Sequence, residues 1–282
     1  MDIEFSHVYF RYPVPGDDWA IRDINLRVQK GERIALIGPA ASGKTTIAQL
    51  LDALILPTRG DILFNSKSVL DLAHNKKLVQ LRRSIGILFQ FPEHQFSQEN
   101  AYEELVFGLR RLFSLDDNTM GEMAESLLNS LGMDLDRIRQ ISPFSLSSGE
   151  KRKLAIASAI IHSPELLVLD EPMAGLDIPG QSELLNILDG LDETTMVIAT
   201  HNLEDFLGIV TRVVGIYSGT KIIDTDTDGL FSQLDIMEHH GITPPLVLQV
   251  QSWLKDAGIA INKTYTSMEE LINYIKELLG QK

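Results

Sequence analysis

The amino-acid sequence predicts an α/β fold with three parts: a mixed-sheet core, a helical subdomain inserted into it, and a small C-terminal helical domain. Short apolar runs of strand length recur along the chain, separated by segments with helical periodicity. The strand signal disappears between residues 90 and 142, and after residue 224 the pattern changes again to amphipathic helices. We therefore expect a first domain over 1–230, with the helical subdomain at about 91–160, and a second domain over 231–282.

The strands expected in the core are short and bounded by polar or turn residues. They span residues 8–12, 24–28, 34–37, 85–89, 166–169, 196–199 and 213–217. Because the later runs are continuously apolar and separated by helical patterns, buried parallel strands with crossover helices are expected there. The first helix is expected over residues 45–54.

Helical spacing of apolar residues marks the insert and the tail. In the insert, residues 102–112 and 120–131 carry it. In the tail, Pro244 and Pro245 precede a helix that Gly258 ends, and the spacing Thr266-x-x-Glu269 predicts a capping box for a second helix.

Composition excludes several classes of function. The 282 residues are 44% hydrophobic and 23% charged, which is typical of a globular protein. The absence of cysteine excludes disulfides and thiolate chemistry. A formal charge of −14 disfavours nucleic-acid binding. No stretch reaches the roughly 18 apolar residues of a membrane-spanning helix, so we expect any membrane role to require a separate partner.

A phosphate-binding loop is predicted at residues 38–45, GPAASGKT, between a buried strand and a helix start. Small residues let successive backbone amides and the helix N-terminus face phosphate oxygens. Lys44 supplies a cation for the β- and γ-phosphates, and the Thr45 hydroxyl suits Mg²⁺. The expected nucleotide-binding residues here are Gly38, Ala41, Ser42, Gly43, Lys44, Thr45 and Thr46.

Two adjacent carboxylates end the apolar run at 166–169. Strand carboxyl ends line the ligand crevice of a parallel sheet. Successive strand residues point in opposite directions, so Asp170 and Glu171 are expected to have different roles. Asp170 is expected to hold Mg²⁺ and Glu171 to act as general base toward the attacking water.

With these motifs in place, the chain resembles the ATP-binding cassette ATPases over about residues 3–224. Residues 146–150, LSSGE, look like the signature of that family and lie 20 residues ahead of Asp170. Further positions that match family motifs are Tyr12 (adenine stacking), Gln90 (lid glutamine), Asp177 (the loop named for its aspartate) and His201 (switch histidine).

The resemblance implies that two cassettes meet head to tail, with each ATP between the phosphate loop of one and the signature of the other. Ser147 and Gly149 then contact the γ-phosphate of the other chain's nucleotide, and a helix N-terminus there favours that contact. In this picture His201 contacts the γ-phosphate, Gln90 senses Mg²⁺ and water, and Asp177 couples the two sites. ATP and Mg²⁺ are the implied ligands.

Three positions depart from the family pattern. Glycine usually stands at Ala41 and Ser148, and glutamine at Glu150. Ala41 and Ser148 preserve backbone donation if their φ angles are negative. Glu150 suits a helix N-terminus but adds negative charge near a phosphate.

The stretch ILFQFPEHQF at 87–96, followed by YEELVFG at 102–108, resembles the energy-coupling-factor subgroup, whose members drive uptake of vitamins and of cobalt or nickel ions. The resemblance implies three partners: a second ATPase, identical or related; an integral membrane subunit; and a substrate-selecting membrane subunit. It also implies a peripheral location on the cytoplasmic membrane face and a tail that helps dimerisation. The acidic residues Glu93, Glu99, Glu103 and Glu104 are either contacts for basic helix ends of the membrane subunit or ordinary surface.

Other readings stay open at this point. They are the ATPase of a different ABC transport system, a non-transport ABC protein acting on nucleic acid, and a regulatory nucleotide-binding module without turnover. Glu171 and His201 argue against the last. The pair His239 and His240 has no acidic or cysteine neighbours at ligand spacing, so we expect a surface feature and not a metal site.

Overall fold

Two sheets organise the computed structural model, which describes residues 1–13, 18–91 and 95–280. The larger sheet has six strands in the order β10-β9-β3-β8-β7-β6. Its strands are β3 (Arg33–Ile37), β6 (Ile85–Leu88), β7 (Leu166–Asp170), β8 (Thr195–Thr200), β9 (Arg212–Tyr217) and β10 (Thr220–Asp226). All neighbours pair in parallel except β10, which is antiparallel to β9. The predicted mixed sheet is confirmed.

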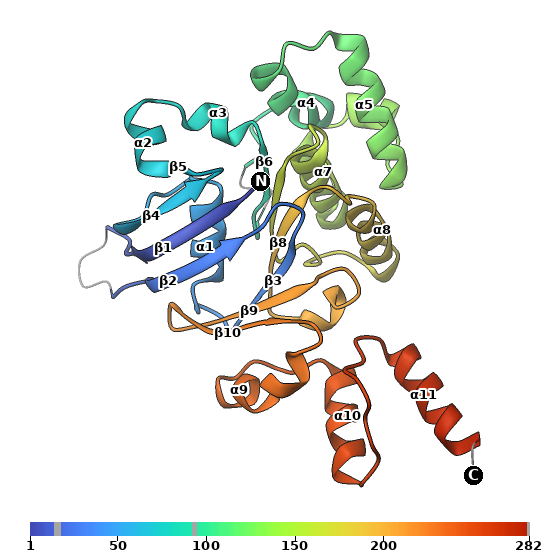
Figure 1. Ribbon diagram of the computed structural model, residues 1–282. Coiled ribbons are helices and arrows are strands. Elements are labelled where there is room, and N and C mark those ends of the chain that lie inside the picture. The colour runs from blue at the N-terminus through green and yellow to red at the C-terminus, as the bar shows by residue number, and fades with distance from the viewer. Residues whose placement is uncertain (14–17, 92–94, 281–282) are drawn as a thin grey trace.

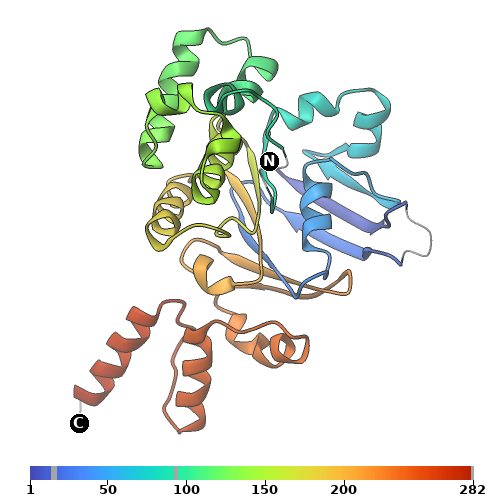
Figure 2. The ribbon, with the colours of Figure 1, turned by 180° about the vertical axis from the view of Figure 1, so that it is seen from behind.

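Both faces of the larger sheet are buried, which explains its unbroken apolar runs. Along β3, Ala35 and Ile37 pack into the core on one side, with helices α7 (Ser148–Ile160) and α8 (Ile178–Asp189). Ile34 and Leu36 face the opposite core. That second core lies between the two sheets and includes the apolar face of α1 (Lys44–Leu51). Helix α1 lies behind β1 and β2 in Figure 1 and in front of them in Figure 2, which shows the molecule from behind.

The smaller sheet is antiparallel, with the order β2-β1-β4-β5. It consists of β1 (Ile3–Phe10), β2 (Ile21–Val28), β4 (Arg59–Phe64) and β5 (Lys67–Ser68), and two short helices follow, α2 (Val69–His74) and α3 (Leu78–Arg82). The prediction placed the first strand five residues late and did not include β4, β5, α2, α3 or β10. Strand β4 begins with Arg59 and Gly60, which carry no strand signal.

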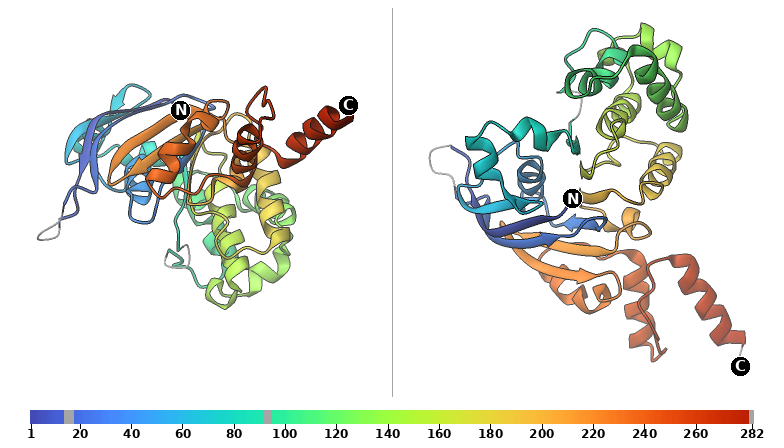
Figure 3. Two further views of the ribbon diagram at one scale, coloured as in Figure 1. Left: turned by 90° about the horizontal axis from the view of Figure 1, so that it is seen from below. Right: turned by 45° about the horizontal axis from the view of Figure 1, so that its top comes forward.

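The helical insert contains α4 (Ala101–Leu112), α5 (Asp117–Ser130) and α6 (Leu135–Gln140), which form a third core with one side of α7. The N-caps of α4, α5 and α6 are Asn100, Asp116 and Asp134, whose side chains accept backbone N–H bonds. These caps fix where each helix starts. The insert and the C-terminal tail lie at opposite ends of the molecule (Figure 3).

The tail contains α9 (Leu234–His239), α10 (Leu246–Asp256) and α11 (Met268–Gly280). Its apolar residues Met237, Val247, Leu248 and Leu271 belong to the same buried cluster as the α7–α8 side of the sheet. The described part of the tail therefore shares a core with the preceding part of the chain. Ser267, not Thr266, immediately precedes α11, so the predicted Thr266–Glu269 capping box is out of phase by one residue.

Candidate nucleotide-binding site

The phosphate loop leaves β3 at Gly38 and wraps around the side chain of Lys44, the first residue of α1. The Lys44 ammonium donates to the carbonyl oxygens of Gly38 (2.7 Å) and Pro39 (3.0 Å). Only 8% of Lys44 is exposed, and burial lowers the pKa of its ammonium, with Glu171 and Asp170 opposing that shift. The Lys44 ammonium is thus held inside the loop, where phosphate oxygens can replace the carbonyl oxygens as its hydrogen-bond acceptors.

Ala41 has a positive φ of 59°, so the condition set for this departure from glycine is not met. An alanine in this region carries a backbone strain of about 1 kcal/mol. Ser148, in contrast, is the first residue of α7 and is helical. Gly38 must be glycine, because a Cβ there would lie 2.2 Å from the carbonyl oxygen of Ile216. The loop is therefore shaped by close contact with β9 as well as by its own sequence.

Asp170, at the end of β7, meets the phosphate loop directly. The Thr45 hydroxyl donates to its Oδ2 at 2.7 Å. Asp170 is 1% exposed, and burial raises the pKa of its carboxyl while the bond from Thr45 lowers it. A buried carboxylate beside a hydroxyl is a set of hard oxygen donors, which fits Mg²⁺.

Glu171 follows Asp170 and points elsewhere, as predicted for successive strand residues. Its Oε2 lies 2.8 Å from His201 Nδ1, at the end of β8. Glu171 has a positive φ of 50°, and its backbone N–H donates to the carbonyl of Ala199 at 2.8 Å. Held strain of this kind in a non-glycine residue is typical of functional sites. The structure therefore brings the candidate base and the switch histidine into contact.

Tyr12 contacts α1 beside the phosphate loop, and Gln90 follows β6. The Tyr12 hydroxyl donates to Gln49 Oε1 (3.0 Å) and lies 3.1 Å from Thr46 Oγ1, both on α1. Tyr12 shares with Ala20 and residues 41–46 a cavity of about 240 Å³. Gln90 is exposed just beyond the end of β6. Glu93 lies outside the described residues.

Arg152, on α7, is a residue that the sequence reasoning missed. It is 2% exposed, and its guanidinium donates to the carbonyls of Phe89 (3.1 Å), Gln90 (2.8 Å), Pro172 (3.3 Å) and Glu171. It therefore joins the lid glutamine segment to the acidic strand end. A signal existed, since Arg152 has the helical phase of the buried Ile156, Ala159 and Ile160.

The signature residues form the start of α7. The Ser147 hydroxyl accepts from the backbone N–H of Glu150 (3.3 Å), and Glu150 Oε2 accepts from the backbone N–H of Ser147 (2.9 Å), a complete capping box. Glu150 also pairs with Arg137 of α6. These contacts lower the pKa of Glu150 to about 2, the Arg137 hydrogen bond being the main cause. The added negative charge noted in the sequence thus has a cation beside it.

Asp177 is the N-cap of α8, and its Oδ1 accepts from the backbone N–H of Gly180 at 3.0 Å. It lines a cavity of about 320 Å³ together with residues 147–150. The predicted residues therefore form two separate groups, because this cavity and the one beside the phosphate loop share no lining residue.

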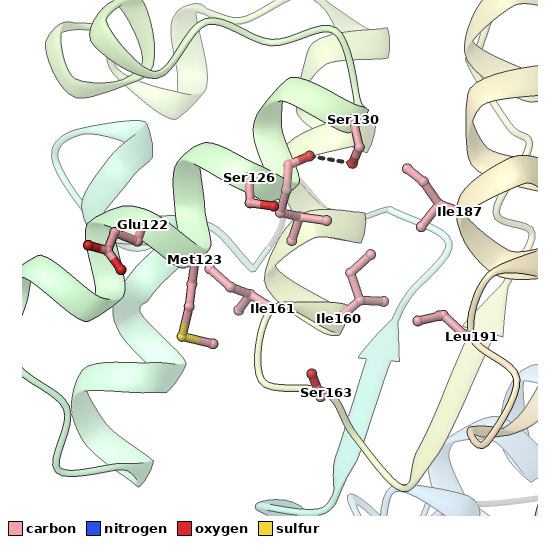
Figure 4. Close-up of a pocket in the computed structure, with 10 residues that line it drawn as sticks. Glu122, Met123, Ser126, Ser130, Ile160, Ile161, Ser163, Ile187 and Leu191 are labelled. Carbon is pink, nitrogen blue, oxygen red and sulfur yellow. Dashed lines mark hydrogen bonds between the residues drawn. The ribbon is translucent and has the colours of Figure 1, made fainter.

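A further cavity, of about 560 Å³, is lined by none of the predicted residues. It lies between α5, the end of α7 and α8, and its walls include Met123, Ile160 and Ile187 (Figure 4). The Ser130 hydroxyl on its rim donates to the carbonyl of Leu127 (2.7 Å). This mainly apolar hollow does not offer the donors that phosphate requires.

The surface features considered earlier have ordinary partners. Glu104 accepts from the backbone N–H groups of Ser97 and Gln98, and Glu103 pairs with Arg110 at 3.4 Å. The ring of His240 packs edge-on against Tyr217, 4.8 Å between centroids. No group of three potential metal ligands occurs among residues 1–13, 18–91 and 95–280. Within those same ranges no helix has the length and apolarity to cross a bilayer.

Comparison with known proteins agrees with this geometry. The family model "ABC transporter" matches residues 21–174, so the chain is an ATP-binding cassette protein. The energy-coupling factor transporter ATP-binding protein EcfA2 of Clostridium tetani (strain Massachusetts / E88) is 32% identical over 281 residues, covering 98% of this chain and 96% of that protein. The chain belongs to the family of energy-coupling factor transporter ATP-binding proteins. It is an ATP-binding and ATP-hydrolysing subunit.

Two solved structures have the same fold. The dimeric bacterial ABC transporter cassette MJ0796 has a TM-score of 0.73 at 24% identity and covers 79% of this chain and 98% of its own. The protein cbiO1 from Clostridium perfringens, part of the ABC transporter complex cbiONQ, has a TM-score of 0.68 at 26% identity, covering 89% of this chain and 98% of its own.

Proposed function

We propose that this chain binds MgATP at residues 38–45 and hydrolyses it when a second cassette closes over the nucleotide, and that this drives solute uptake through a membrane complex. The 2.7 Å contact between Thr45 and Asp170 carries the proposal, because it joins the phosphate loop to the acidic strand end. The contact between Glu171 and His201 supports it, because the proposed base and the proposed γ-phosphate ligand are neighbours.

Each residue then has a role that its position supports. Lys44 and the loop amides bind the β- and γ-phosphates, and Tyr12 stacks on adenine. Thr45, Asp170 and Gln90 would hold Mg²⁺, which neutralises charge on the phosphates. Glu171 accepts a proton from the attacking water, while His201 orients the Glu171 carboxylate and contacts the γ-phosphate.

The second half of the site comes from another cassette. The cavity at residues 147–150 is separate from the phosphate-loop cavity, so one chain alone leaves the nucleotide open on one side. Ser147, Gly149 and the N-terminus of α7 would face the γ-phosphate of the partner's nucleotide, and Asp177 would couple the two sites. Dimeric MJ0796 supports this arrangement by its fold.

The partners follow from the relatives. The name of cbiO1 places that protein in a transporter complex, which supports an integral membrane subunit and a substrate-selecting membrane subunit as partners here. The chain would then lie on the cytoplasmic face of the membrane, without a role on nucleic acid. Vitamins or transition-metal ions are the proposed solutes, and the second ATPase is an identical or a related chain.

Two measurements test the proposal. Titration of the purified chain with MgATP should give saturable binding, and Lys44→Ala should weaken it by about a hundredfold, because a charge-assisted contact with phosphate is lost. The complex purified from membranes through a tag on this chain should release phosphate from MgATP, and Glu171→Gln should slow release by at least about a hundredfold while MgATP still binds. A folded chain that takes up no MgATP contradicts the proposal.

A further inference from the structure

Arg137 and Glu150 form an ion pair at the signature, the part of the chain that binds the partner's nucleotide in the proposed function. We propose that Arg137 is a positioning residue of this half-site: its guanidinium neutralises Glu150 and so lets the phosphates of the partner's nucleotide approach the start of α7. The inference rests on the proposed function, because it concerns how the second cassette meets that nucleotide.

Glu150 cannot move out of the way without a cost to the helix. Its Oε2 accepts the backbone N–H of Ser147, and its own N–H donates to the Ser147 hydroxyl, so the carboxylate is part of the cap that starts α7. Its side chain is 27% exposed. With a pKa lowered to about 2, it is an anion at any pH near neutrality. The helix dipole attracts phosphate to the N-terminus of α7, whereas an anion fixed at that position repels phosphate.

The other charged groups lining the cavity do not neutralise Glu150. Lys153 donates to Glu183 Oε2 (2.5 Å) and to the carbonyl of Leu131 (2.9 Å), so its charge is already paired. Asp177 is a further carboxylate and caps α8. Of the described residues that line this cavity, Arg137 is therefore the cation placed to compensate Glu150.

Arg137 is also held where this role requires it. Its backbone N–H donates to the Asp134 side chain (2.7 Å), the N-cap of α6, which fixes the first turn from which the guanidinium extends. Half of its side chain, 52%, is exposed. The guanidinium thus lines the cavity and pairs with the carboxylate while half of the side chain remains exposed.

A double-mutant cycle on the membrane complex tests this role. Arg137→Ala should raise KM for ATP about tenfold, with kcat within about twofold, because an uncompensated anion then opposes phosphate. Glu150→Gln keeps the capping box, since glutamine serves at that position. It should leave KM at or below the wild-type value. The double variant R137A/E150Q should return KM to within about twofold of wild type. Arg137→Lys, which keeps the charge, should behave as wild type.

Arg110→Ala is the matched control. Arg110 lies on α4 in the same subdomain, is 48% exposed and pairs with Glu103 at 3.4 Å and Asp117 at 3.3 Å, but it does not line the signature cavity. Its loss should leave KM unchanged. Because exposed ion pairs contribute little to stability, both arginine variants are expected to fold.

The outcomes separate this inference from the proposed function. If R137A/E150Q remains as impaired as Arg137→Ala, or if Arg137→Ala leaves KM unchanged, Arg137 does not act through Glu150 and the inference is wrong. MgATP titration of the isolated chain reports the phosphate loop alone, and Arg137→Ala should not alter it. Absence of binding in the wild-type chain would contradict the proposed function instead.

Discussion

Helices α1 and α7 both begin at a motif that we propose faces a nucleotide, yet their first turns carry opposite charges. Helix α1 starts with Lys44, whose ammonium is buried against the carbonyls of its own loop. Helix α7 has Glu150 in its first turn, paired with Arg137 from another helix. The phosphate loop thus attracts phosphate with its own cation. In the proposed function the signature has no unpaired cation and would bind phosphate through backbone donors, the helix dipole and a carboxylate that Arg137 neutralises.

This difference agrees with a division of labour between the two half-sites. A phosphate loop with its own cation can bind MgATP in a single chain, whereas the signature can receive only a nucleotide that another chain already holds. The variants below alter one helix or the link between them, in order of decreasing expected effect.

Arg152 is the link, because it extends from α7 to the strand ends beside the phosphate loop. Arg152→Met removes the donor to the carbonyls of Phe89, Gln90, Glu171 and Pro172 while it keeps the stem that packs in the core. Buried carbonyls without donors should lower the free energy of unfolding by about 3 kcal/mol or more. Urea unfolding measures this, and Lys151→Met on the same helix, a less buried position, is the control. Equal stability of both variants would refute the link.

Asp52 is the C-cap of α1, and Glu150 lies in the first turn of α7. The pKa of Asp52 is raised above its ordinary value, whereas that of Glu150 is lowered. Burial raises the pKa of Asp52 to about 7, with Arg82 opposing the shift. The unfolded chain releases this proton near pH 3.8, so the wild-type protein should lose stability as pH rises from about 4 to 7. Asp52→Asn should remove that loss and add about 3 to 4 kcal/mol above pH 7 and little at pH 4. Parallel stability curves for wild type and variant would contradict this assignment.

Ala41 tests whether strain in the phosphate loop matters. Glycine adopts a φ of 59° without strain, whereas alanine is strained there. Ala41→Gly should therefore stabilise the folded chain by up to about 1 kcal/mol, reduced in part by the greater entropy of the unfolded chain. Thermal unfolding gives the sign, and MgATP titration shows whether the relaxed loop binds more tightly. A lower melting temperature for Ala41→Gly would show that the positive φ of Ala41 does not destabilise the folded chain.

The sequence predicted the parallel strands of the larger sheet and the phosphate-loop motif because both have strong local signals. Buried parallel strands such as β3 and β7 are unbroken apolar runs, and the phosphate loop combines a motif with a strand-to-helix context. The pairing of Arg137 with Glu150 joins two helices across a turn and leaves no periodic trace. The positive φ of Ala41 is set by the loop's packing, which the residue type alone does not reveal. Motifs that are contiguous in the sequence were therefore predictable, whereas contacts and backbone conformations set by other parts of the fold were not.

Glu150→Gln should give the smallest effect on stability, and it should be seen in how steeply stability declines in acid. The folded-state pKa of Glu150, about 2, lies below its ordinary value of 4.5, so the carboxylate contributes stability above pH 4.5 that is lost as pH falls toward 2. Since the pair is partly exposed, the difference should be below about 1 kcal/mol. Chemical unfolding at pH 3 to 5 should therefore show a shallower acid decline for Glu150→Gln than for wild type. Arg137→Ala should reduce the decline as well, because the Arg137 hydrogen bond is the main cause of the low pKa. An unchanged slope in both variants would mean that the pair does not hold the carboxylate as described.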